Sequence, residues 1–220
     1  MPLGDIGSVV ASVSFDTGGI NFPHVIHVSG DIFAVVYRDG DDTGDLQTWQ
    51  IDSGGIIGAA LIGTLQFENT YCDAPRIIQV SGTTYLIVYA EVDQPGETTG
   101  RLHAKTLTIN PDGTVGAAVI DTLVVDAGLC REVDVLHISG EVYAVVYRGP
   151  GNDGWMATFT VSAAGVISNA VTDTLEFDTT SGFGPVIIKV AGTIYAIAYC
   201  QLTANEITVA TVDIQTDGTI

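Results

Sequence analysis

Four apolar runs of similar pattern recur along the chain, and each ends at a tyrosine. These runs are rich in β-branched and aromatic residues, which is typical of strands covered on both faces. A glycine precedes every run, as a tight turn between two strands requires. The four copies of the turn and run span 27–37, 79–89, 137–147 and 189–199. Their closing tyrosines lie 52, 58 and 52 residues apart, a period typical of solenoids, propellers or arrays.

Each repeat is interpreted as four antiparallel strands. In the first repeat, a short strand over 25–28 follows a proline, and the glycine turn leads to a second strand over 32–37. A third strand over 46–51 alternates polar and apolar residues with a period of two, and a further glycine turn leads to a fourth strand ending at 65–67. No segment has helical periodicity, so the chain is expected to be all-β.

Four four-stranded units of this size predict a β-propeller of four blades, a single domain over residues 1–220. Residues 13–16 match a fourth strand, whereas the last unit stops after its third strand and turn. The N-terminal strand is therefore expected to pair with the C-terminal blade, which closes the ring and removes an exposed edge. The expected blades are 17–68, 69–126, 127–178, and 179–220 completed by 1–16.

The sequence leaves the manner of ring closure open. Closure within one chain is favoured by effective concentration. The alternative is a homodimer in which two chains exchange terminal strands and form an eight-bladed ring. The similarity of the repeats is also compatible with a piece of a longer array.

The repeat spacing resembles that of β-propellers as a class, over essentially the whole chain. It lacks the Gly-His and Trp-Asp pairs of WD repeats and the diglycine of kelch repeats, and it has no terminal disulfide of the hemopexin-like kind. The resemblance implies the architecture and no particular family.

The chain has 26 acidic and 7 basic side chains, a formal net charge of −19. Such a field repels nucleic acid and anionic membranes, so neither is an expected partner, and no apolar run is long enough for membrane insertion. An acidic surface is typical of secreted, cell-surface or salt-adapted proteins, although no signal peptide is visible. Three cysteines, an odd number, are not a disulfide framework. Cys72 and Cys130 occupy equivalent loops, however, so a disulfide between these two is an open alternative.

The loops between blades share one face of a propeller with the loops between second and third strands. Here these loops are rich in carboxylates, amides and aromatic rings, so this acidic loop face is the expected binding surface. Asp, Asn and Gly also favour turns for structural reasons alone. The candidate ligand-binding residues are Asn21, Phe22, Arg38, Tyr71, Asp73, Arg131, Arg148, Asn152, Trp155 and Phe183.

One of these loops resembles the start of a calcium-binding loop. Asp39, Asp41 and Asp45 could offer oxygen ligands to a hard cation. Thr43 is a weaker ligand, however, and Gln50 stands where such a loop ends on an acid. A polar hairpin is therefore the preferred interpretation, and calcium is the single cofactor that the pattern suggests.

The histidines suggest no catalytic or metal site. His27 and His137 stand just before two of the glycine turns and are expected to be solvated strand ends. His24 and His103 have no evident partner in the sequence and are expected on the surface.

No motif for a nucleophile, a zinc site or a phosphate loop occurs in the chain. The four loop sets differ far more than the strands do, which favours one asymmetric site over a repeated one. The primary hypothesis is a non-enzymatic binding or scaffold module for carbohydrate (lectin-like) or protein. The alternative is a glycan-active hydrolase or lyase, which should gather two carboxylates with shifted pKa values in a central cleft.

Overall fold

A computed structural model describes residues 8–15, 18, 21–92, 100–202 and 204–220. These residues form four antiparallel sheets in chain order, each a meander in which successive strands pair. The first three sheets have four strands and the last has three, so the fold is all-β as the sequence predicts. No helix in the described part of the chain is long and apolar enough to cross a membrane.

The sheets are called blades 1 to 4. Blade 1 contains β1 (Asn21–Ser29), β2 (Ile32–Arg38), β3 (Gly44–Gln50) and β4 (Gly63–Glu68). Blade 2 contains β5 (Asp73–Ser81), β6 (Thr84–Val92), β7 (Gly100–Thr108) and β8 (Asp121–Asp126). Blade 3 contains β9 (Arg131–Ser139), β10 (Val142–Arg148), the short 3-10 helix η1 (Pro150–Asn152), β11 (Gly154–Thr160) and β12 (Asp173–Asp178). Blade 4 contains β13 (Phe183–Ala191), β14 (Ile194–Gln201) and β15 (Glu206–Asp213).

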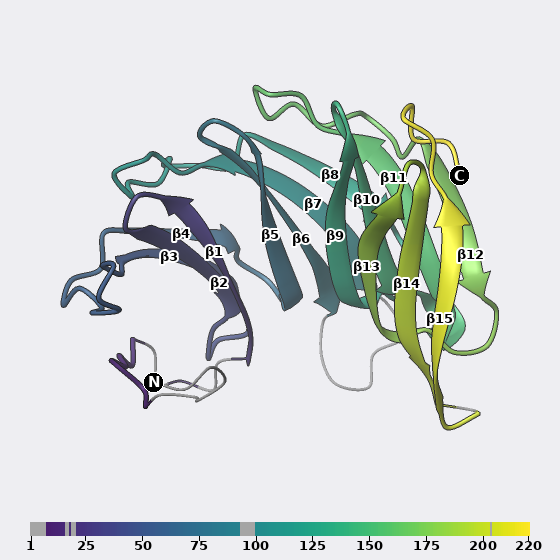
Figure 1. Cartoon of the computed structure of the whole chain (residues 1–220), viewed down its shortest axis with the longest axis horizontal. Coiled ribbons are helices and arrows are strands. Elements are labelled where there is room, and N and C mark those ends of the chain that lie inside the picture. Colours follow the sequence, from purple (N-terminus) through teal and green to yellow (C-terminus); the bar gives the residue numbers. More distant parts are fainter. Residues whose placement is uncertain (1–7, 16–17, 19–20, 93–99, 203) are drawn as a thin grey trace.

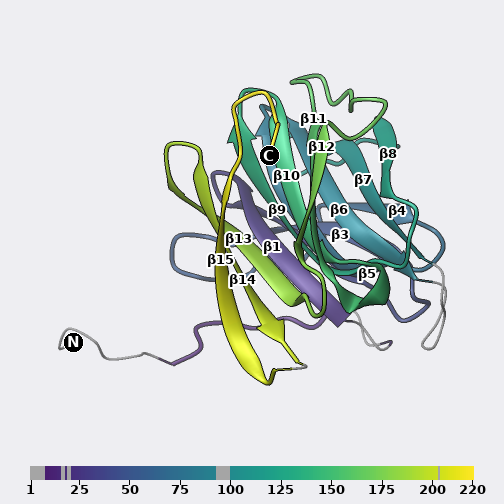
Figure 2. The ribbon, with the colours of Figure 1, turned by 90° about the vertical axis from the view of Figure 1, so that its right-hand side faces the viewer.

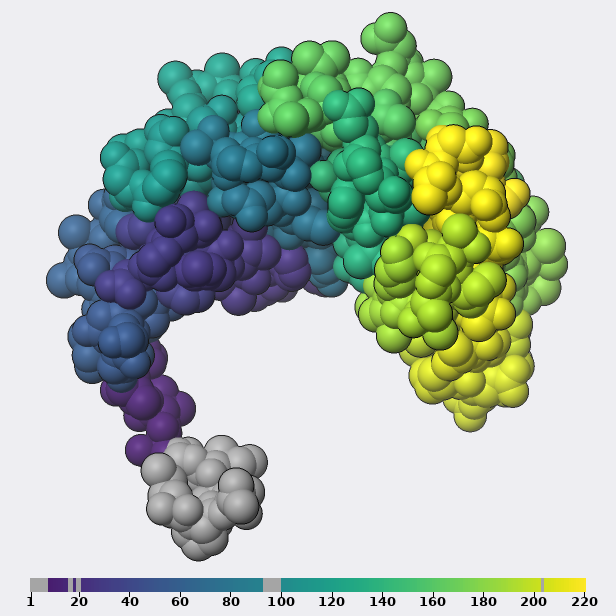
Figure 3. Space-filling model, turned by 45° about the horizontal axis from the view of Figure 1, so that its top comes forward, coloured from purple at the N-terminus to yellow at the C-terminus, as the bar shows by residue number. Residues whose placement is uncertain are grey.

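The blades stand side by side along an open arc, with blade 1 and blade 4 at its two ends (Figure 1). The first strands of neighbouring blades contact one another, β1 with β5, β5 with β9 and β9 with β13. The space-filling view shows the same arc, with a hollow between blade 1 and blade 4 (Figure 3). This arrangement is of the β-propeller type.

Three hydrophobic cores fill the three interfaces between blades. At the first interface, Val36 and Leu46 of blade 1 belong to the same buried cluster as Tyr85 of blade 2. Val88 of blade 2 and Tyr143 of blade 3 share the buried cluster at the second interface. Val146 of blade 3 and Tyr195 of blade 4 share the one at the third. The apolar runs recognised in the sequence are therefore second strands covered on both faces, as their composition predicts.

The glycine turns between first and second strands adopt the left-handed backbone that the sequence predicts. Their φ angles are 53° at Gly30, 52° at Gly82, and 56° at Gly140 and Gly192. The side chain before the turn closes it, since His27 Nε2 lies 2.7 Å from the Gly30 carbonyl oxygen. His137 and Gln79 make the same contact with their own turns, at 2.9 and 2.8 Å.

Among the residues that the structure describes, the ring closure expected from the sequence is not formed. The described N-terminal residues 8–15 form no strand, and Phe15 packs against Tyr37 and Trp49 of blade 1 rather than against blade 4. The N-terminal segment and blade 4 lie at opposite ends of the arc (Figure 1). Blade 4 therefore has three strands among the described residues, none of which forms a fourth strand beside β15.

The three cysteines are free. Cys72 and Cys130 are fully buried in different clusters, at separate interfaces between blades. Both behave as small apolar core residues, and burial raises the pKa of each thiol.

Candidate functional site

The first strand of every blade starts with a β-bulge. In β1, Asn21 pairs with Arg38, but the next regular pair joins His24 to Val36, so two residues face one on β2. The same shift in register occurs at the start of β5, β9 and β13. The predicted first strands began only after the proline position, because the bulge that accommodates the proline was not foreseen.

The second residue of each first strand has a left-handed backbone. The φ angles are 55° at Phe22, 46° at Ala74, 52° at Glu132 and 56° at Gly184. Three of these four residues are not glycine, and such a backbone costs a non-glycine residue on the order of 1–3 kcal/mol. Backbone strain of this kind is concentrated at functional sites. The starts of the first strands are therefore the candidate location of a functional site.

Arg38, at the end of β2, lies among side chains that enter from three strands or loops. Its guanidinium stands 5.4 Å from the centre of the Phe22 ring and 5.0 Å from that of Tyr71, and it donates a hydrogen bond to the Tyr71 hydroxyl. The same guanidinium faces the carboxylates of Asp42 at 3.5 Å and Asp73 at 3.9 Å. Arg38 thus links blade 1 to the start of blade 2.

Arg148 occupies the equivalent position at the end of β10. Its guanidinium lies 4.2 Å from the centre of the Phe183 ring and 3.2 Å from a carboxylate oxygen of Glu132. It also donates a hydrogen bond of 3.3 Å to the side chain of Asn152. Arg148 thus reaches blade 4 through the Phe183 ring, whereas its polar partners Glu132 and Asn152 belong to blade 3 itself.

Asp73 connects these two groups of residues. Its side chain is almost fully buried, and burial raises the pKa of its carboxyl in spite of the opposing charges of Arg38, Arg131 and Arg148. The carboxylate of Glu132 also contributes to the rise in pKa. We call these five residues, Arg38, Asp73, Arg131, Glu132 and Arg148, the rim cluster. It holds three of the seven basic side chains of an otherwise strongly acidic chain.

A cavity of about 90 Å³ opens beside the rim cluster. Arg131, Arg148 and Asn152 line its polar side, and Leu129 and Gly149 contribute to the rest. Within the described part of the chain, the Arg131 guanidinium has no hydrogen-bond or ion-pair partner, unlike those of Arg38 and Arg148. Guanidinium groups bind carboxylates in a planar, two-pronged geometry, so this cavity fits one acidic group.

Nine of the ten candidate residues named from the sequence lie in or beside these contacts. Trp155 is the exception: its indole lies against Gly149 of the cavity lining but packs on the core between blades 2 and 3, and its ring nitrogen is buried without a partner among the described residues. Sequence reasoning missed Glu132, which no motif marks. Its one local signal is its place directly before Val133, at the position where Phe22, Ala74 and Gly184 of the other blades stand directly before a proline.

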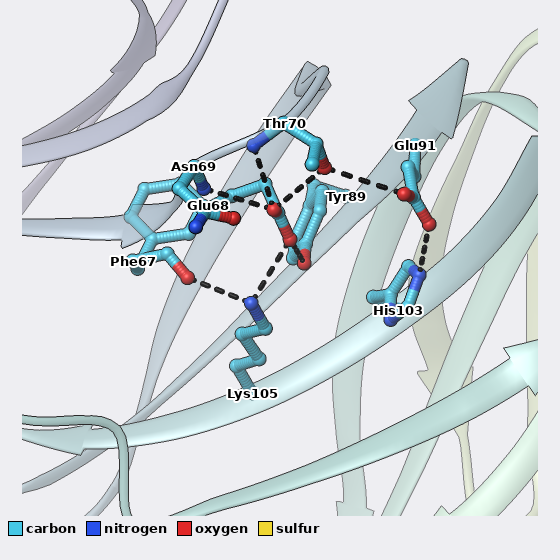
Figure 4. A network of polar contacts seen from close by, with 8 residues as sticks. All are labelled: Phe67, Glu68, Asn69, Thr70, Tyr89, Glu91, His103 and Lys105. Atoms are coloured by element: carbon cyan, nitrogen blue, oxygen red, sulfur yellow. Dashed lines mark hydrogen bonds and ion pairs between the residues drawn. The ribbon is translucent and has the colours of Figure 1, made fainter. Parts of the chain in front are cut away.

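A second polar network lies between blades 1 and 2 (Figure 4). The Tyr89 hydroxyl donates a hydrogen bond to the Glu68 carboxylate, which also faces the Lys105 ammonium at 2.9 Å. Burial alone would raise the pKa of Glu68, but hydrogen bonds from Tyr89, Thr70 and Lys105 outweigh it and lower the pKa to about 2. His103 is also buried here and lies 2.8 Å from Glu91.

A hydrogen bond from a tyrosine hydroxyl to a carboxylate recurs at every interface between blades, and this network is its most extended form. Tyr147 donates a hydrogen bond of 2.8 Å to Asp126, and Tyr199 donates one of 2.9 Å to Asp178. In each case the carboxylate ends the fourth strand of one blade, and the tyrosine lies 21 residues later in the next. We therefore interpret the network around Glu68 as structural.

Two histidines expected on the surface are placed otherwise. His103 is buried, because it stacks on Tyr89 at 5.3 Å between ring centres. His24 is half-buried, and its Nδ1 accepts a hydrogen bond of 3.2 Å from the backbone N–H of Ile77 in the next blade. Neither contact follows from local sequence, since both partners come from another strand.

The loop that resembles a calcium site forms a polar hairpin. The Asp39 carboxylate accepts hydrogen bonds from the backbone N–H groups of Asp41 and Thr43, at 3.0 and 2.9 Å. Asp45 accepts one from the Thr43 hydroxyl at 3.0 Å. Among the described residues, no group of three or more acidic, histidine or cysteine side chains is placed to hold a metal ion.

Comparison with known proteins gives the fold and no family. No family model matches the chain, and no curated protein sequence matches it. Several solved structures are similar. A protein of unknown function from Dyadobacter fermentans has a TM-score of 0.61 at 13% identity, over 94% of this chain and 67% of that one.

Two carbohydrate-active enzymes are also similar in structure. A putative exo-β-1,3-galactanase from Bifidobacterium bifidum has a TM-score of 0.52 at 13% identity, over 89% of this chain and 67% of that one. A GH43 β-xylosidase/α-arabinofuranosidase from a compost metagenome has a TM-score of 0.50 at 13% identity, over 91% of this chain and 76% of that one. At these identities the likeness shows the fold alone, a β-propeller type.

Proposed function

We propose that this chain is a glycan-active hydrolase whose rim cluster binds an acidic carbohydrate. The observation that carries the proposal is the pair of carboxylates at the starts of β5 and β9. Asp73 and Glu132 come from neighbouring blades and share one electrostatic environment with three guanidinium groups. The likeness to propeller-type glycoside hydrolases supports a carbohydrate as the substrate.

Glycoside hydrolysis requires two carboxyl groups with different roles. One must carry a proton for the leaving oxygen, and the other must be ionised to act as base or nucleophile. Burial raises the pKa of Asp73, which suits it to donate the proton. Glu132 lies 3.2 Å from the Arg148 guanidinium, and we assign it the role of base or nucleophile.

The cavity beside the cluster suggests the class of sugar. The cavity is small, at about 90 Å³, and two arginines line its polar side, which suits a carboxylate substituent of a sugar. Arg131, which has no ion-pair partner among the described residues, would bind that carboxylate, so we propose a substrate that contains uronic acid. The Phe22 and Phe183 rings flank the cluster and offer apolar faces to the sugar.

One observation favours a second candidate, a glycan-binding module without catalysis. Both carboxylate oxygens of Glu132 have partners, one the Arg148 guanidinium and the other the Gly184 N–H at 2.6 Å. A carboxylate held in this way has little freedom to attack or to take up a proton. Under this candidate, Glu132 only positions Arg148.

The test is hydrolysis and binding with a panel of neutral and uronic-acid oligosaccharides. We expect Asp73→Asn to reduce turnover on the order of 10²–10⁴-fold and to retain binding, because only the proton donor is lost. Arg131→Gln should weaken binding of uronic-acid oligosaccharides and leave neutral ones unaffected. Asp112→Asn, an exposed change in the turn after β7, is the matched control and should change neither.

Binding of uronic-acid oligosaccharides without turnover, with loss on Arg131→Gln, would favour the module without catalysis. If no oligosaccharide binds or is cleaved, both candidates fail. The pH profile gives an independent check. Because the pKa of Asp73 is raised, turnover should fall as the pH rises through that raised pKa, at higher pH than for an ordinary aspartate.

A further inference from the structure

The outer face of blade 4 is apolar and uncovered. Val186 and Ile188 of β13 are 49% and 62% exposed, and Ile207 and Val209 of β15 are 71% and 66% exposed. Seen from the side of blade 4, β13, β14 and β15 lie at the front of the molecule, with no other segment over them (Figure 2). In the described part of the chain, β15 pairs with β14 alone, so its other edge is free.

The same face is fully covered in the other three blades. Val209 pairs with Ala198, and the corresponding third-strand residues Leu46, Ala104 and Met156 are all 0% exposed. Each of these three is covered by the next blade, through tyrosines and β-branched residues of its first and second strands. The exposed face of blade 4 therefore resembles one side of an interface between blades, without a following blade to cover it.

The opposite end of the arc presents the complementary half. On blade 1, Val25 stands where Ile77 stands on blade 2, yet it is 57% exposed rather than 2%. Phe33 and Val35 of the same face are half-buried. Blade 1 thus offers the surface that blades 2, 3 and 4 each use to cover the preceding blade.

The N-terminal segment already lies where a preceding blade would place its fourth strand. Phe15 meets Tyr37 at 5.7 Å between ring centres, with planes at 64°. Phe67 of β4 meets Tyr89 at 5.5 Å and 64°, and Phe177 of β12 meets Tyr199 at 5.1 Å and 57°. Residues 8–15 have no charged side chain, and Val9, Val10 and Val13 are exposed.

From these observations we infer that blade 4 docks onto blade 1 of a second copy of this chain. Residues 11–15 of that copy add to the free edge of β15 as the missing fourth strand. Two copies joined in this way at both ends form one ring of eight blades. The contact is head-to-tail, and it closes because each copy supplies one half of both interfaces.

Closure within a single copy would need a different geometry at every interface. The three existing interfaces are tightly packed and are joined by the same buried hydrogen bonds, from Thr48, Thr106 and Thr158 to a glycine carbonyl of the next blade. Packed interfaces of this kind do not deform gradually. A second copy covers both exposed faces without changing any of the three.

The blade architecture also predicts the register of the added strand. Met156 of β11 pairs with Leu175, two residues before Phe177. Val209 is the counterpart of Met156, and Val13 stands two residues before Phe15. Val13 of one copy should therefore face Val209 of the other.

The test combines solution mass with crosslinking. We expect a mass of 46 kDa by light scattering, twice the 23.0 kDa of one chain. In a Cys200→Ser background, a Val13→Cys chain and a Val209→Cys chain refolded together should form a disulfide between chains under mild oxidation. Opposite cross-strand residues are close enough for such a bond.

A matched pair of lysine variants tests the face itself. Val209→Lys places a charge at the centre of the docking face and should reduce the mass to 23 kDa. Val124→Lys, at a residue of β8 that is 43% exposed outside this face, should remain at 46 kDa. A mass of 23 kDa for the unmodified chain would overturn the inference. So would a Val13→Cys/Val209→Cys double variant that crosslinks only within one chain.

Discussion

At the scale of single residues, the left-handed backbone appears in two settings with different origins. In the turns between first and second strands it falls on glycine, and a side chain added at Gly30 or Gly140 would meet no atom within 4 Å. At the bulges it falls on Phe22, Ala74 and Glu132, where glycine would be easier. Glycine lets the turn adopt the left-handed backbone without strain. At the bulges the backbone is strained, and the side chains there lie in or beside the rim cluster.

The turn can be tested at one residue with a matched control. Gly140→Val should lower the free energy of unfolding by about 1–2 kcal/mol, because a β-branched residue is strained in the left-handed region. Gly140→Asn should cost much less, since asparagine tolerates that backbone. Chemical denaturation measures both values. Equal losses for the two variants would contradict the assigned role of the glycine.

The Glu68 carboxylate should contribute to stability in a pH-dependent way. Its pKa of about 2 in the folded chain lies below the ordinary value of 4.5, so its stabilising effect is complete above pH 4.5 and is lost as the pH falls towards 2. The contribution is at most about 3 kcal/mol. Glu68→Gln should lower stability at neutral pH and flatten the decline between these pH values.

Denaturation curves measured across this acidic range give the comparison. The control is Glu141→Gln, an exposed change in the turn before β10. This variant should follow the parent chain at every pH. A Glu68→Gln chain that declines as steeply as the parent would show that another carboxylate dominates.

At the scale of elements, the blades are joined by ties that repeat with the sequence. A buried threonine in the third strand of one blade donates a hydrogen bond to a turn carbonyl of the next, as Thr106 does to Gly165 at 2.5 Å. At the other end of the blade, a tyrosine donates to the carboxylate that ends the preceding blade. Each interface is therefore held at both ends by polar groups and in the middle by apolar ones.

The threonine tie can be removed with little change in shape. Thr106→Val should lower the free energy of unfolding by about 1–3 kcal/mol, because the buried Gly165 carbonyl loses its hydrogen bond. Thr64→Val, at an exposed threonine of β4, is the control and should stay within about 0.5 kcal/mol of the parent. Similar losses in the two variants would mean that the tie contributes nothing specific.

At the scale of the whole molecule, the net negative charge opposes compaction and association, whereas the exposed apolar faces of the open arc favour association. A net charge of −19 opposes compaction through self-repulsion, and the described ion pairs engage few of the 26 acidic side chains. The apolar faces at the two ends of the arc favour association. The rim cluster gathers positive charge in one place within this acidic field, which would attract an acidic ligand locally.

Salt should therefore stabilise the chain. Adding sodium chloride screens the repulsion between carboxylates, so the melting temperature should rise with ionic strength. Potassium chloride should give the same rise, because screening does not depend on the identity of the cation. A melting temperature that falls with both salts would show that the ion pairs outweigh the repulsion.

The sequence alone determined the strands, the glycine turns and the division into four repeats, because each depends on patterns within a few residues of one another. The period of two, the β-branched runs and the residue before each turn needed no knowledge of distant contacts. The recurring spacing of 21 residues between acid and tyrosine was also present, as in Asp126 and Tyr147, and it acquired meaning only once the strands were placed.

Tertiary structure alone decided the rim cluster, the buried places of His103 and Glu68, and the open end at β15. The rim cluster brings together the ends of β2, β5, β9 and β10, which are far apart in sequence, so no local pattern relates Asp73 to Arg148. Ring closure depends on the rotation between packed blades, which side-chain packing at three interfaces sets. Local sequence specifies strands and turns, but electrostatic environment and blade rotation arise from contacts between residues that only the fold brings together.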